Sequence, residues 1–226
     1  MNLLGNFELN AALSQSDDLL ARSKVQMADC GSIWPECENR LAHHCLNSLC
    51  GELERARKAA SKCDAVVLSW TTRNLLEMSI VAKYLAVGKE NRRDFVEQAI
   101  GDFYYFMKTL REIEGPRGST DAMLEELKQR TQSDYRNGGS VTSQKLAEKI
   151  GLTTDSRFKL LSKLSHPTPF FTIGGTSLVP EVDTSFTWDS YAGVLLKWSN
   201  SYASEILDSI SQRPETGQPA EQSDVA

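Results

Sequence analysis

The segment that decides the fold is residues 63–86, CDAVVLSWTTRNLLEMSIVAKYLA, which combines helical periodicity with a high apolar content. Apolar residues cover both faces of the projected helix, with Trp70 on one face and Leu68 on the other. A helix that is apolar on all sides is normally enclosed by other helices. We therefore expect this segment to form the central helix of its domain.

Two charged residues, Arg73 and Glu77, interrupt the apolar segment. Their i,i+4 spacing places them one turn apart on the helical face that also carries Trp70 and Tyr84. A buried charge is costly unless it is paired, so the presence of both charges here requires a reason. The sequence allows a structural ion pair that fixes helix register, or a polar pocket that directs the guanidinium at an anionic or carbonyl group.

Helical periodicity continues through most of the chain, whereas strand signals are scarce. The expected helices cover residues 7–27, 35–60, 63–86, 95–113, 121–131, 143–150, 155–165 and 188–210. Together they predict an all-α fold, an antiparallel helical bundle. A short irregular or hairpin insertion is expected near 168–187, where Pro, Phe, Thr and Gly dominate. The domain organisation is then a single helical domain at 1–211 and a disordered tail at 212–226.

The composition is that of an ordinary globular protein, with 40% hydrophobic and 24% charged residues among 226. The net charge of −5 argues against a protein that coats nucleic acid by bulk electrostatics. Residues 1–20 lack the basic and apolar regions of a secretory signal, and no stretch is long enough to span a membrane. We therefore expect a cytoplasmic protein without a membrane partner.

The five cysteines lie at positions 30, 37, 45, 50 and 63 and match no common zinc or redox spacing. His43, Asn47 and Cys50 could share a helical face, but a tetrahedral metal site needs ligands from a second segment. We therefore expect no metal and no cofactor. The cysteines are interpreted as reduced, partly buried thiols that behave as small apolar residues.

A further candidate is His166, in the sequence LSHP at 164–167. Proline disfavours helical geometry in the residue before it, so His166 is expected at a helix end, where the macrodipole favours an imidazolium. The alternative is a terminal histidine hydrogen-bonded to a carbonyl or a carboxylate such as Glu77. The candidate catalytic residues are Arg73, Glu77 and His166, and the candidate binding residues are Trp70, Tyr84, Ser162, Lys163 and Ser165.

Residues 145–165 also resemble the two core helices of a helix-turn-helix. The sequence KLAEKIGL at 145–152 is followed by a turn and a helix that carries Arg157 and Lys163. The Asn-Gly-Gly sequence at 137–139 interrupts the chain where a preceding helix would be needed, and Arg157 projects with the leucines. DNA binding is therefore a second alternative only.

Three motifs together resemble a bacterial all-helical family of unknown function. They are RNLLE at 73–77, LAEKIG at 146–151 and FKLLSKLSHP at 158–167. That family combines an Arg-x-x-x-Glu helix with a late Leu-Ser-x-x-x-His-Pro-like segment, and the resemblance covers about 63–168. It implies no activity, but it implies one site formed by Arg73, Glu77, Ser162 and His166.

A more distant similarity is to HEPN-type helical bundles, whose metal-independent ribonucleases use an Arg and a His a few residues apart on one helix. In this chain the nearest arginine before His166 is Arg157, and Arg73 lies on another helix. A ribonuclease would need His166 as the general acid/base and Arg73 to stabilise the phosphorane.

The sequence leads to three readings of function and leaves open whether the protein is an enzyme. The first is a ligand- or partner-binding module built around a buried site of Arg73, Glu77 and His166. Its partner would be a small anionic ligand, RNA or another protein, and a homo-oligomer is possible. The alternative is a HEPN-like metal-independent ribonuclease in a toxin or phage-defence setting, and the second alternative is a helix-turn-helix DNA-binding protein. A purely structural role for the three residues is a further hypothesis.

Overall fold

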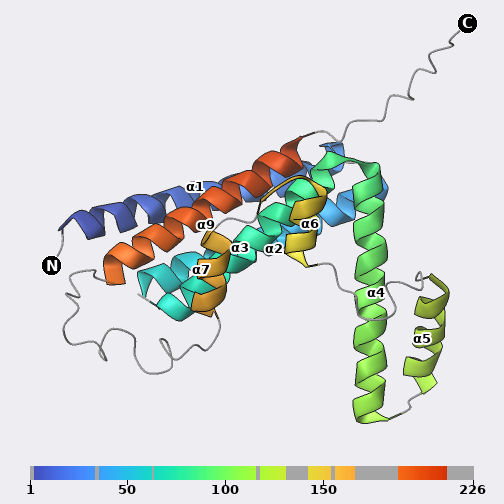
Figure 1. The fold of residues 1–226 in the computed structure, drawn as a ribbon. Helices are drawn as coiled ribbons and strands as arrows, with labels where there is room; N and C mark the ends of the chain where they lie inside the picture. The colour runs from blue at the N-terminus through green and yellow to red at the C-terminus, as the bar shows by residue number, and fades with distance from the viewer. Residues whose placement is uncertain are drawn as a thin grey trace, which may run out of the picture. The chain divides into compact units, whose positions relative to one another are not determined.

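The computed structural model describes residues 3–33, 36–62, 64–115, 118–130, 142–153, 156–165 and 188–212. Within these ranges the chain forms eight helices and no strand (Figure 1). They are α1 (Leu3–Ile33), α2 (Glu36–Ser61), α3 (Ala65–Val87), α4 (Lys89–Glu114), α5 (Gly118–Arg130), α6 (Ser143–Lys149), α7 (Ser156–Ser165) and α9 (Trp188–Ser211). The predicted all-α fold is confirmed. The insertion expected near 168–187 and residues 213–226 of the expected tail lie outside the described residues.

The helices divide between two compact units. Of the described residues, those within Met1–Lys83 and Thr153–Arg213 form the first unit, and those within Tyr84–Leu152 form the second. Thus α1, α2, α7, α9 and most of α3 belong to the first unit, and the last turn of α3 belongs to the second with α4, α5 and α6. Compactness alone does not show that a unit folds independently, so the single domain at 1–211 stays a prediction.

A leucine-rich core holds the first unit together. Helix α1 packs against α2 and α9, and α2 packs against α9. The fully buried leucines are Leu46, Leu49, Leu53, Leu68, Leu75, Leu161, Leu195, Leu196 and Leu207. Complete burial of one such side chain contributes about 1.5–3 kcal/mol, so this cluster dominates the stability of the unit.

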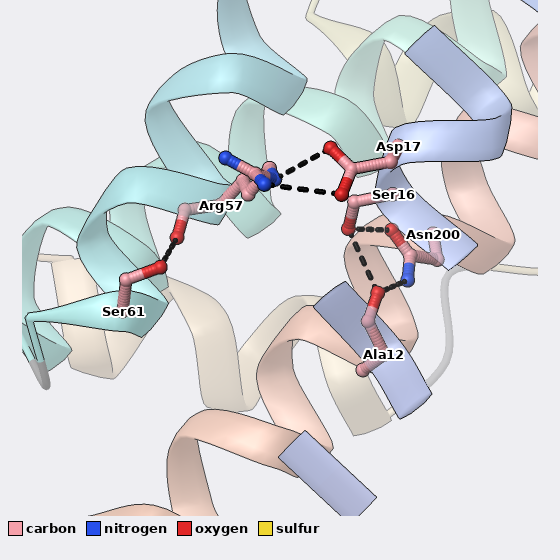
Figure 2. Close-up of polar contacts among 6 residues, drawn as sticks. All are labelled: Ala12, Ser16, Asp17, Arg57, Ser61 and Asn200. Carbon is pink, nitrogen blue, oxygen red and sulfur yellow. Dashed lines mark hydrogen bonds and ion pairs between the residues drawn. The ribbon is translucent and has the colours of Figure 1, made fainter. Parts of the chain in front are cut away.

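Polar contacts fix the position of α9 against α1 inside this core. The side chain of Asn200 is fully buried. Its Nδ2 donates to the Ala12 carbonyl at 2.7 Å, and its Oδ1 accepts from Ser16 Oγ at 2.8 Å (Figure 2). At the surface Arg57 joins α2 to α1 through Asp17, with Nε–Oδ1 at 2.8 Å (Figure 2). A buried amide with its partners in place specifies one register of the helix pair.

Helix α3 is enclosed on one face only in its first turns. Leu68 and Leu75 are fully buried, and Thr72 Oγ1 lies 2.9 Å from Ser199 Oγ of α9. On the other face the Trp70 side chain is 59% exposed. The expectation of a helix enclosed on all sides is therefore wrong for these turns, because α9 covers the leucine face and leaves the tryptophan face open to solvent.

The second unit is organised by Asp94 of α4. Its Oδ2 accepts hydrogen bonds from Tyr84 Oη at 2.5 Å, Gln98 Nε2 at 2.7 Å and Lys149 Nζ at 2.8 Å. These contacts tie the end of α3 and α6 to α4. Helix α5 packs along α4 and is joined to it by an ion pair between Arg111 and Asp121.

Candidate functional site

The Arg73–Glu77 pair forms as the sequence predicts. Because α3 is continuous between the two residues, Arg73 Nε donates to Glu77 Oε1 at 3.0 Å. The side chains are 22% and 34% exposed, however, so the expectation of a buried pair is wrong. The pair lies on the α3 face that α9 does not cover. A pair of this kind contributes only about 0.2–0.5 kcal/mol to helix stability.

A second helix brings an aromatic ring to this pair. The Cζ atom of Arg73 lies 5.7 Å from the centroid of the Phe158 ring in α7, within the range of a cation–π contact. Helix α7 is anchored there by the fully buried Leu161 and by Arg157, whose Cζ lies 5.7 Å from the ring centroid of Trp198 in α9. Side chains from both α3 and α7 therefore contribute to the site.

Phe158 was not among the residues predicted for the site. The available signal was its position one helical turn before Ser162, on the face of α7 that carries the candidate binding residues. Its position on α7 does not identify the residue that Phe158 contacts, because Arg73 lies in a segment far away in the chain.

Three of the predicted binding residues lie near this contact in sequence and helical position. Trp70 is exposed one turn before Arg73, and its side chain is on the same face of α3. Ser162 is half-buried one turn after Phe158, and Lys163 next to it is exposed. Ser165 is the last residue of α7, and its side chain lies outside the description. His166 also lies outside the described residues, so its approach to Arg73 and Glu77 stays a prediction.

Tyr84 takes part in a different cluster. It is buried in the second unit, where its hydroxyl donates to Asp94 and its ring centroid lies 5.7 Å from Lys149 Nζ. Along α3 it is separated from Arg73 by about 16 Å, since an α-helix rises about 1.5 Å per residue. The structure thus engages Tyr84 with the Asp94 cluster rather than with the ion pair.

The segments that resemble a helix-turn-helix fall into different units. Helix α6, capped by Thr142 Oγ1 accepting from Lys145 N at 3.3 Å, belongs to the second unit, and α7 belongs to the first. Arg157 is directed at Trp198, in agreement with its projection on the leucine side. DNA binding by these two segments stays a prediction.

The cysteine region has the chemistry of packed thiols. Cys30 is buried, and Cys45 and Cys50 are half-buried. Burial raises the pKa of Cys45 to about 11, and the neighbouring Cys30 adds to the effect. A thiol with such a pKa is a poor nucleophile and a poor metal ligand at neutral pH. Among the described residues no three His, Cys, Asp or Glu side chains gather as a metal site would need.

Within the described residues no helix combines the length and apolar content needed to cross a bilayer. Comparison with protein-family models, with curated proteins and with solved structures finds no match to this chain. The resemblance to the bacterial helical family, and the more distant one to HEPN bundles, therefore stays a prediction.

Proposed function

We propose that the first unit is a ligand-binding module whose binding surface, the α3–α7 site, consists of Trp70, Arg73, Glu77, Phe158 and Ser162. One observation carries this proposal: a partly exposed ion pair on α3 is joined by a cation–π contact to a ring from α7. The contact places an aromatic ring of α7 beside a guanidinium that stays partly exposed to solvent.

The chemistry of the α3–α7 site favours a small anion that carries an aromatic ring. The bond from Arg73 Nε to Glu77 fixes the plane of the guanidinium, which stays partly exposed to solvent. A guanidinium held in this way recognises phosphate and carboxylate groups. The exposed indole of Trp70, one turn away, offers a flat apolar surface for stacking. A mononucleotide is the simplest ligand with both properties.

We assign His166 to the same site as a second cationic group. Its support is its position in the sequence, directly after the last residue of α7. In this proposal His166 and Lys163 of α7 offset the negative charge of Glu77.

The test is calorimetric titration of the full chain with adenosine monophosphate. We expect saturable binding that Arg73→Gln weakens by about tenfold or more, since a lost charged hydrogen bond costs about 1.5–3 kcal/mol. Trp70→Ala should weaken it as well, through the lost stacking. The matched control is Arg93→Gln, because Arg93 Nε also donates to a glutamate, Glu97, at 3.0 Å, but on α4.

Three results would contradict this proposal. The first is an absence of binding, and the second is an equal loss of affinity in the Arg93→Gln control. The third is turnover of a short single-stranded RNA that His166→Ala abolishes while circular dichroism shows an intact fold. That result would replace the binding module by the ribonuclease alternative.

A further inference from the structure

Helix α4 carries an apolar stripe that faces solvent. Its members are Val96, Phe103, Phe106 and Ile113, and the last two side chains are 58% and 77% exposed. All four project on one face of the helix. Such a stripe normally marks the face that packs against another element, yet here it is open while polar residues of the same helix, Arg92 and Gln98, are buried.

We propose that this stripe is the surface through which two copies of the chain associate, with α4 of one copy antiparallel to α4 of the other. The stripe is symmetric about its midpoint, since its members follow one another at intervals of seven, three and seven residues. An antiparallel pair centred between residues 104 and 105 therefore places Val96 opposite Ile113 of the second copy. It also places Phe103 opposite Phe106 of the second copy, so that one patch is complementary to itself.

One charge contact along α4 fits the same arrangement. Lys89 and Arg93 lie on one edge of the stripe near the start of the helix, and Glu114 and Arg111 lie on this side near its end. Arg93 and Arg111 also pair with Glu97 and Asp121 within one copy. Two-fold symmetry brings the same edge of both copies together, so Glu114 comes within one turn of Arg93 of the second copy. Antiparallel alignment also sets the positive end of each helix dipole beside the negative end of the other.

The size of the stripe predicts a weak dimer. Two phenylalanines and two aliphatic side chains at these exposures present on the order of 400 Å² of apolar surface. A standard interface buries about 800 Å² on each partner. This area consists of an apolar centre and a polar rim around it. We therefore expect association with a dissociation constant in the micromolar range.

The experiment is sedimentation velocity of the full chain over about 1 to 100 µM. We expect a reversible monomer–dimer equilibrium whose dissociation constant Phe106→Glu raises at least tenfold, because a charge would be buried in the apolar centre. Tyr105→Glu is the control, since Tyr105 is an exposed aromatic residue outside the stripe, about 100° around α4 from Phe106. It should leave the dissociation constant unchanged.

The antiparallel register has its own test. Phe103→Lys and Phe106→Glu should each abolish self-association, but a mixture of the two variants should form a heterodimer, because the introduced lysine meets the introduced glutamate. A chain that stays monomeric throughout the concentration range overturns the proposal. So does a Phe106→Glu variant that associates as strongly as the unaltered chain. A mixture that fails to associate overturns the register.

Discussion

The two units treat apolar helix faces in opposite ways. In the first unit, helices α2 and α9 bury most of their leucines completely, as Leu49 and Leu196 show. In the second unit, α4 has an equally regular apolar stripe, but Phe106 and Ile113 are exposed. The difference shows that periodicity identifies the residues that share a face, whereas burial depends on how many neighbouring helices the unit supplies. With fewer helices, the second unit leaves the stripe of α4 open.

The largest expected effect is a difference in the free energy of unfolding between a substitution on the buried face of α9 and one on the exposed stripe of α4. Leu196→Ala should lower the free energy of unfolding by about 2–5 kcal/mol, because it leaves a cavity in a packed core. Phe106→Ala should change it by about 0.5 kcal/mol or less when the protein is dilute enough to be monomeric. Urea unfolding followed by circular dichroism measures both values. Equal losses would show that the α4 stripe is buried within the monomer.

An intermediate effect compares the polar clusters of the two units. Asn200→Ala should cost about 1–3 kcal/mol, since Ser16 Oγ and the Ala12 carbonyl each lose one buried partner and keep only their bond to each other at 2.9 Å among these contacts. Asp94→Asn preserves the shape of its side chain but weakens three hydrogen bonds, and we expect a loss of about 1 kcal/mol. Thermal unfolding of both variants shows which substitution costs more stability. A larger loss for Asp94→Asn would mean that the polar contacts of the second unit contribute more.

The smallest effect compares the two Arg-x-x-x-Glu pairs. Arg73–Glu77 and Arg93–Glu97 have the same Nε–Oε1 distance of 3.0 Å. A double-mutant cycle should assign about 0.2–0.5 kcal/mol to each charge pair. Arg73→Gln alone should cost about 0.5–1 kcal/mol more than Arg93→Gln, because it also loses the contact with the Phe158 ring. Identical single-variant losses would indicate that this ring contributes nothing to the stability of the unit.

The sequence predicts the helices well because helical periodicity is a local property. The central segment, expected at 63–86, is found as Ala65–Val87. The largest error among the helix starts is in α4, which begins at Lys89 rather than at 95, since its first turns are polar and carry no apolar pattern. The Arg73–Glu77 pair could likewise be predicted from the sequence, because both partners lie on one helix.

Features that depend on contacts between distant segments could not be predicted from the sequence. The contact of Phe158 with Arg73 and that of Arg157 with Trp198 require the position of α7 against α3 and α9. The partial exposure of the ion pair has the same origin, since an apolar pattern on both faces of a helix does not say which face a neighbour covers. The division into two units also escaped detection, because the boundary lies inside α3.

The insertion of the second unit within the sequence of the first has a consequence for protein synthesis. Asn200 of α9 contacts Ser16 of α1 across 184 positions of the chain, so the first unit cannot complete its core until the ribosome has made α9. The second unit, by contrast, is continuous over Tyr84–Leu152. At about 5–20 residues per second, the nascent apolar faces of α1 to α3 wait many seconds for α9. The unit that starts first is thus the one that finishes last, and its early helices are the segments most in need of a chaperone.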